Sequence, residues 1–251
     1  MVIVQTWAAY AGNRGEAVAR HALHRGYDVT MAEVRSTAHR EYLHAIYALE
    51  ESGTPAIQAR IADWLGVSRA SVSEMVRRLQ AEGLVAAATG AVDLTGRGRA
   101  IAESVVRRHR LAERFLSDML QLPWVKVHAE AGSWEHVISD DVEAAMQRAM
   151  GSPATCPHGN PIPGSGYVSP PARPVIDLEA GEGGVIDRLS EELEGDLEMM
   201  EFLDDSNLRP GVPIEVVART PGGVITLRTE GGAPVGLGAF TAERIMVTNP
   251  G

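Results

Sequence analysis

The sequence has 251 residues, of which 45% are hydrophobic, and its formal net charge is −10. A chain of this length can bury a substantial core, and it has no run of about 18 apolar residues that would predict a membrane span. The N-terminus lacks the basic, apolar and small-residue segments of a secretory signal, so we expect a cytoplasmic protein with no membrane partner. The single cysteine, Cys156, excludes an internal disulfide.

Charge is divided unevenly along the chain. From Arg60 to Arg114 there are ten arginines and six acidic residues, whereas from Asp177 to Asp205 there are twelve acidic residues and one arginine. The first segment suits a surface that faces DNA phosphates, and the second repels DNA or collects cations. Ordinary solvated helix faces would give the same composition, so charge alone does not decide between these interpretations.

The first 36 residues carry the weakest pattern. A strand, a glycine-rich turn, a helix and a second strand are compatible with this segment, but one such unit cannot bury its own sheet. We treat residues 1–36 as an extension of unknown role.

A helix-turn-helix is predicted next. Apolar residues at helical spacing indicate a helix from about His39 to Gly53, and a second helix is expected over 56–65. Ser68 is expected to cap a third helix that reaches about Glu82. A short turn with a glycine joins the last two helices, which is typical of a motif that places its second helix in the major groove.

A wing and a helical region follow. Two short strands, 84–88 and 91–94, flank Thr89-Gly90 and predict a hairpin. A long helix is expected over 95–122 and another over 128–150, and the apolar stripe of the second is typical of a dimer interface.

Proline, glycine and serine are frequent in 151–174, which predicts a linker, and the remainder has short apolar strands (214–218, 224–228, 245–247) that suit a small barrel. The expected class is mainly α with a small β part: a winged helix-turn-helix, a helical dimerisation domain and a C-terminal barrel. The expected segments are 37–100 for DNA binding, 101–151 for metal binding and dimerisation, 152–174 for the linker and 175–251 for the barrel.

The third helix and the segment after the wing carry the candidate DNA contacts. Arginine reaches guanine or phosphate, serine donates to phosphate, alanine touches a thymine methyl, and glutamate accepts from cytosine. A capped helix with scattered arginines is the plainer alternative. The candidates are Ser68, Arg69, Ala70, Ser71, Ser73, Glu74, Arg77, Arg97 and Arg99.

Histidines and carboxylates at helical spacing form a candidate metal site. His109 and Glu113 are an i, i+4 pair, and His128, Glu135 and His136 share one side of the next predicted helix with Gly132. Imidazole and carboxylate are ligands that first-row divalent metals accept. A single histidine is more often a structural residue, but three with two glutamates in register favour a metal site.

Several motifs carry a resemblance to a known family. They are Glu41-Tyr42-Leu43, Ala59-Arg60-Ile61-Ala62, Gly83-Leu84-Val85, His109-Arg110-Leu111-Ala112-Glu113-Arg114, Trp134-Glu135-His136-Val137 and Gly159-Asn160-Pro161-Ile162-Pro163-Gly164. With them the chain resembles the diphtheria toxin repressor family of iron- and manganese-dependent regulators over about four fifths of its length. The resemblance implies that the C-terminal barrel is SH3-like.

The resemblance also implies two metal sites. The primary site would use Glu41, Glu135 and His136, with a backbone carbonyl or water near Gly132, where the family usually supplies a side-chain ligand. The second site would use His109, Glu113 and His128. The resemblance implies that Cys156 and His158 help to complete this second site, because they belong to a Cys-Pro-His-Gly sequence seen in manganese-responsive relatives. It implies the same role more weakly for Asp196. An incidental thiol is the alternative for Cys156.

The ligand set favours manganese. The primary site offers oxygen and imidazole nitrogen only, and such hard ligands suit Mn(II), with Fe(II) also compatible. We therefore expect a homodimeric repressor of metal homeostasis genes that binds double-stranded operator DNA when Mn(II) is bound. The alternatives are an Fe(II)-dependent repressor of iron uptake, a metal-dependent hydrolase, and a winged helix that binds no metal.

Overall fold

The computed structural model describes residues 36–87 and 90–249. The strand, helix and strand considered for the first 36 residues lie outside the described residues, apart from Ser36, and so does Thr89 of the expected wing turn. The described part of the chain contains no helix that is both long and apolar enough to span a membrane.

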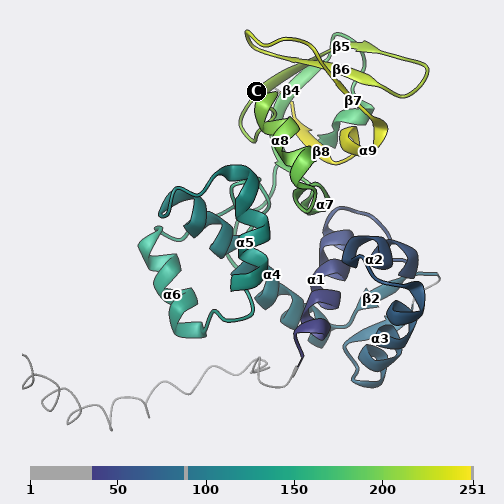
Figure 1. The fold of residues 1–251 in the computed structure, drawn as a ribbon, viewed down its shortest axis with the longest axis vertical. Coiled ribbons are helices and arrows are strands. Elements are labelled where there is room, and N and C mark those ends of the chain that lie inside the picture. The colour runs from purple at the N-terminus through teal and green to yellow at the C-terminus, as the bar shows by residue number, and fades with distance from the viewer. Residues whose placement is uncertain (1–35, 88–89, 250–251) are drawn as a thin grey trace, which may run out of the picture. The chain divides into compact units, whose positions relative to one another are not determined.

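The expected helix-turn-helix is present. Helices α1 (Thr37–Glu51), α2 (Gln58–Leu65) and α3 (Arg69–Ala81) follow one another, as Figure 1 shows. Gly66 ends α2 in the left-handed conformation, with φ at 63°, and the Ser68 hydroxyl accepts from the backbone N–H of Ser71 at the start of α3. Helix α3 therefore starts where the sequence predicts.

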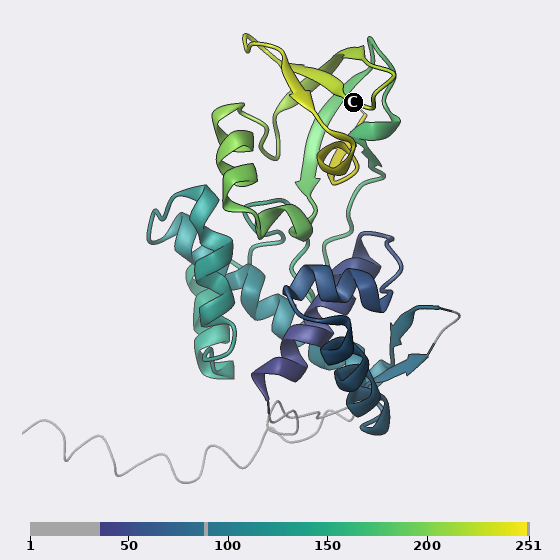
Figure 2. The ribbon, with the colours of Figure 1, turned by 45° about the vertical axis from the view of Figure 1, so that its right-hand side comes forward.

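The wing consists of β1 (Val85–Ala87) and β2 (Val92–Leu94), an antiparallel pair that projects beside α2 and α3 in Figure 2. The Glu50 carboxylate of α1 accepts from the backbone N–H of Leu94 at 3.0 Å. This bond ties the wing to α1.

Helix α4 (Gly96–Asp118) runs against α1 and is joined through the 3-10 turn η3 (Trp124–Lys126) to α5 (Val127–Trp134). The single helix expected over 128–150 is wrong, because the chain turns after α5 and begins α6 (Asp140–Ala149). Ser139 caps α6 by accepting from the backbone N–H of Val142 at 3.3 Å.

The C-terminal part is a small antiparallel sheet with short helices. The strand order is β3-β8-β4-β5-β6-β7. Sixteen buried apolar side chains, from Val175 to Val247, form its core. Its elements are β3 (Arg173–Pro174), η4 (Val175–Asp177), β4 (Gly183–Leu189), α7 (Glu191–Glu194), α8 (Leu197–Asp205), β5 (Pro213–Arg219), β6 (Ile225–Thr229), β7 (Val235–Leu237), α9 (Ala239–Ala242) and β8 (Ile245–Thr248).

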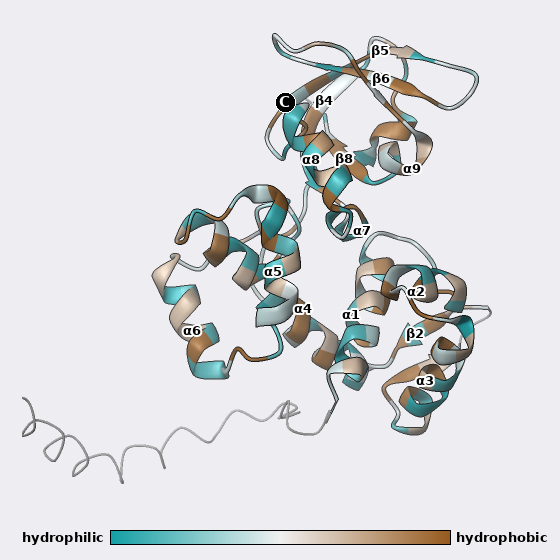
Figure 3. Ribbon diagram, viewed as in Figure 1, coloured by the Kyte–Doolittle hydropathy of each residue, from teal (hydrophilic) through white to brown (hydrophobic). Residues whose placement is uncertain are grey.

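Helices α3 and α6 contain both hydrophobic and hydrophilic residues, as expected of helices with one buried face (Figure 3). In α6, Met146 is buried, whereas Val142 stays 47% exposed. A second apolar core joins α4, α5 and α6 around Leu111, Leu116 and Ile138. These packed helices hold the polar side chains described next.

Candidate metal centre and nucleic-acid interface

Five segments, far apart in the sequence, supply the histidines and carboxylates of one buried region. Helix α1 contributes Glu41 and His44, and α4 contributes His109 and Glu113. Helix α5 and the turn after it contribute His128, Glu135 and His136. The loop before β3 contributes Cys156 and His158, and α7 contributes Glu191 and Glu194.

The largest cluster surrounds Glu113. The Glu113 Oε1 atom lies 3.2 Å from His109 Nε2, 3.2 Å from His128 Nδ1 and 3.4 Å from His158 Nδ1. The Glu194 Oε2 atom lies 3.1 Å from the same nitrogen of His128 and 2.9 Å from that of His158. Two donors that bind one ion at about 2.1 Å each, at right angles, lie about 3 Å apart, so these separations fit a metal shell.

The Glu113 cluster lacks full hydrogen bonding. Glu113 Oε2 is buried and makes no hydrogen bond to the described residues, whereas His158 Nδ1 and Glu194 Oε2 are in contact at 2.9 Å as an ion pair without hydrogen-bond geometry. Buried polar atoms normally find partners, so an unpartnered carboxylate oxygen among converging imidazoles and carboxylates fits a cation site. Cys156 adds a sulfur within 4.8 Å of its partners Glu113 and His158.

Burial and charge act in opposite directions on this cluster. Burial alone raises the pKa of Glu113, but His109 and His158 outweigh burial and hold it well below its usual range. Burial alone lowers the pKa of His158, but Glu194 and Glu113 raise it well above its usual value. Burial raises the pKa of the Cys156 thiol to about 12. A raised pKa means that His158 holds its proton more tightly, and a metal ion bound through this ring would displace that proton.

The residues assigned to the primary site form a looser group. His136 Nε2 lies 3.8 Å from Glu41 Oε1 and 3.5 Å from Glu135 Oε1. Gly132 supplies no side chain, and a β-carbon built on it would meet no atom within 4 Å. A space therefore exists where the resemblance leads us to expect a further ligand.

Three acidic or basic side chains in this region were not expected from the sequence. His44 lies within 4.8 Å of its partners His109 and Glu135, Glu194 joins the Glu113 cluster, and Glu191 contacts His44. The available signals were the spacing of Glu41 with His44 on α1 and of Glu191 with Glu194 in the acidic segment, each i, i+3. Neither spacing predicts which residues from other segments these side chains contact.

Asp196 is placed elsewhere. Its carboxylate caps α8 by accepting from the backbone N–H of Met199 at 3.1 Å, and the side chain is exposed. Among the described residues, the acidic side chain that reaches the Glu113 cluster from this segment is Glu194.

The candidate DNA contacts divide into an exposed face and a paired set. Ser68, Arg69, Ala70, Ser71, Glu74 and Arg77 are exposed on α3, and Ser73 is half-buried. Glu74 pairs with Arg78, and the Arg77 guanidinium donates to the Ser73 carbonyl at 3.2 Å.

The two arginines that follow the wing are engaged within the protein. Arg97 donates to the Glu82 carbonyl at 3.2 Å, and Arg99 pairs with Glu50. Arg69 is therefore better placed than Arg99 to contact a phosphate.

Family models match most of the described chain. Residues 36–89 match the N-terminal DNA-binding domain of iron-dependent repressors, and 95–164 match the metal-binding and dimerisation domain of the same proteins. Residues 173–249 match the FeoA domain.

Curated relatives and solved structures agree with these matches. The chain is 39% identical over 218 residues to the iron-dependent repressor IdeR of Mycobacterium tuberculosis, covering 82% of this chain and 94% of the relative. It is 37% identical over 200 residues to the diphtheria toxin repressor of Corynebacterium diphtheriae, covering 76% and 88%. A solved manganese-dependent transcriptional repressor in complex with manganese is 35% identical, with a TM-score of 0.76, covering 84% of this chain and 100% of that one.

Proposed function

Because this chain belongs to the iron-dependent repressor (diphtheria toxin repressor) family of metal-dependent transcriptional repressors, we propose that it is a homodimeric transcriptional repressor that binds operator DNA when Mn(II) is bound. As its ligand is chromosomal DNA, it acts in the cytoplasm. The observation that carries the metal-sensing part is the convergence of imidazoles and carboxylates from α1, α4, α5 and α7 beside a helix-turn-helix. Membership of a family of transcriptional repressors argues against the metal-dependent hydrolase, which was one alternative in the sequence analysis.

The proposed primary centre uses Glu41, Glu135 and His136, with a water in the space beside Gly132. The proposed second centre uses His109, Glu113, His128 and His158, with Cys156 and Glu194 completing it. Asp196 has no place in this assignment, because its carboxylate caps α8.

The donor set supports manganese over iron at the primary centre. Its side chains offer oxygen and nitrogen alone, and hard ligands suit Mn(II). The similar solved repressor named for manganese supports the same choice for this chain. Fe(II) is the competing assignment, favoured by the names of the curated relatives.

A metal at these centres would join α1 to α4 and α5. Glu41 lies on α1, which packs against α2 and the wing, whereas Glu135 and His136 follow α5. Fixing these elements fixes the position of α3 in each subunit. Two recognition helices then match half-sites about one helical turn apart, so bound metal raises operator affinity.

Calorimetric titration with Mn(II) tests the two centres. We expect two ions per chain, with one step lost in His136→Ala and the other in His128→Ala. Arg228→Ala, which changes an exposed ion pair with Glu215 in the C-terminal sheet, is the control and should bind both ions. A chain that takes up no Mn(II), Fe(II) or Zn(II) would favour the metal-free winged helix instead.

Replacement of Glu41 by methionine tests the choice of metal. A thioether is a softer ligand than a carboxylate, so Glu41→Met should lower the affinity of the primary centre for Mn(II) relative to Fe(II). Anaerobic titrations of both ions report the ratio. An unchanged ratio contradicts the assignment of Glu41 as a ligand.

A further inference from the structure

The Glu191 carboxylate of α7 joins two other helices. Its Oε1 accepts from His44 Nε2 of α1, and its Oε2 accepts from Arg110 Nη2 of α4 at 3.0 Å. All three side chains are buried, with His44 9%, Glu191 5% and Arg110 1% exposed. Removal of one partner from a buried ion pair leaves an uncompensated charge, so these contacts fix α7 against both helices.

Arg110 closes this network on α1. Its Nη1 donates to Glu51 Oε1 at 3.0 Å, near the end of the helix that carries His44. Glu191 is therefore itself held in place, and its position cannot change without disturbing α1 and α4.

The other nitrogen of His44 faces the primary centre. His44 Nδ1 lies 3.6 Å from Glu135 Oε2, and His109 Nδ1 donates to the same oxygen at 2.6 Å. The remaining oxygen, Oε1, is the one that faces His136 Nε2 at 3.5 Å. A hydrogen bond from His109 and a longer ion-pair contact from His44 thus hold this oxygen, so that the other oxygen of Glu135 points at the proposed ion.

We propose that His44 is a positioning residue for the primary metal centre and that Glu191 of α7 acts through it, so that the C-terminal region sets the metal affinity of Glu135. The inference rests on the proposed function, because it concerns the same centre. Residues that orient a metal ligand from behind typically contribute about 10-fold to 100-fold in metal affinity. By linkage, an ion bound at the primary centre also tightens the contact between α7 and α1.

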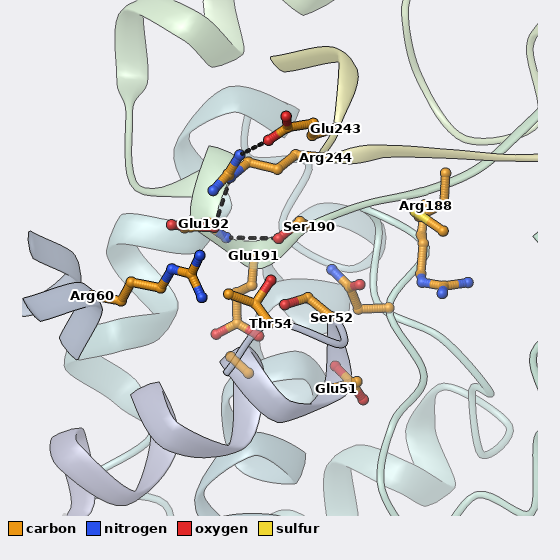
Figure 4. Close-up of a pocket in the computed structure, with 13 residues that line it drawn as sticks. Glu51, Ser52, Thr54, Arg60, Arg188, Ser190, Glu191, Glu192, Glu243 and Arg244 are labelled. Atoms are coloured by element: carbon orange, nitrogen blue, oxygen red, sulfur yellow. Dashed lines mark hydrogen bonds and ion pairs between the residues drawn. The ribbon is translucent and has the colours of Figure 1, made fainter. Parts of the chain in front are cut away.

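Glu192 provides a matched control on the same short helix. Its carboxylate pairs with Arg244 of the C-terminal region, as Figure 4 shows. Glu192→Gln therefore removes a charge from α7 without touching His44 or Arg110.

The test measures Mn(II) binding by the full chain and the variants Glu191→Gln, His44→Gln, the double variant and Glu192→Gln. The primary step is identified as the one that His136→Ala removes, and thermal unfolding of each metal-free variant reports its fold. We expect both single variants to weaken the primary step about tenfold, with the other step unchanged. The double variant should bind no more weakly than His44→Gln, and Glu192→Gln should match the wild type.

Equal primary affinity in wild type and Glu191→Gln overturns the inference, and so does a double variant whose losses multiply to about a hundredfold, because multiplication marks independent effects. Glu191→Gln keeps a side chain of equal size beside Arg110, so it tests the inference even if His44→Gln does not fold. Absence of any Mn(II) binding by the wild type would instead contradict the proposed function.

Discussion

One side chain, that of His109, contacts residues of both proposed metal centres. The His109 ring meets Glu113 and His128 through Nε2 and Glu135 through Nδ1. One imidazole therefore touches both proposed centres, so an ion at one centre fixes the ring that the other centre uses.

Histidine protonation predicts the pH dependence of the metal-free protein. Burial alone lowers the pKa of His44, but Glu191 and Glu135 raise it from 6.5 to about 9. A group whose pKa is raised by folding stabilises the fold fully below its unfolded pKa and loses this contribution as pH rises through the folded value. The difference corresponds to about 3 kcal/mol.

Urea unfolding in the presence of a chelator should therefore show a loss of stability between pH 6.5 and 9. His44→Gln should lose less over the same range. Identical pH slopes for the two proteins would show that His44 does not hold this proton.

Arg69 is the residue that best tests the DNA interface. It is exposed at the start of α3, directly after the Ser68 cap. Arg69→Ala should weaken operator binding by about 1–3 kcal/mol if the guanidinium reads a base edge. Titrations at several salt concentrations check this against Arg228→Ala, and equal affinities would exclude a contact.

At the scale of elements, close packing constrains α4. A β-carbon on Gly98 would lie 1.9 Å from the Leu84 carbonyl oxygen, whereas one on Gly96 would meet no atom within 4 Å. Gly98 therefore lets the first turn of α4 approach the chain at the start of the wing.

The two glycines give a matched pair of variants. Gly98→Ala should destabilise the protein by about 1–3 kcal/mol through overpacking, and Gly96→Ala should be neutral or slightly stabilising. Urea unfolding measures both. A Gly98→Ala variant as stable as Gly96→Ala would contradict the close approach.

Local rules predicted the elements that local contacts determine. Gly66 and Ser68 place the helix-turn-helix because a left-handed cap and a hydroxyl cap act within a few residues. The sequence pattern does not reveal the break between α5 and α6, because Ser139 lies inside an apolar stripe with helical spacing. The i, i+4 spacing of His109 and Glu113 predicts that these two side chains belong to one cluster. His44 and Glu191 are 147 residues apart, so no local sequence pattern predicts their contact.

At the scale of the whole molecule, the proposed switch links three parts of the chain. Carboxylates of α7 reach the ligand clusters, and α1 carries Glu41 beside the helix-turn-helix. The remaining proposed ligands come from α4, from α5 with the turn after it, and from the loop before β3. In the proposed switch, a change in metal occupancy would act on the contacts that position α3.

The most direct test is a DNA-binding curve of the full chain at increasing Mn(II), on a fragment selected from random DNA by the metal-loaded protein. The affinity of wild type should rise at least tenfold as Mn(II) saturates, a coupling of about 1.4 kcal/mol or more, and His136→Ala should show no such rise. An affinity that is the same in chelator and in saturating Mn(II), Fe(II) or Zn(II) would contradict metal-dependent binding of operator DNA.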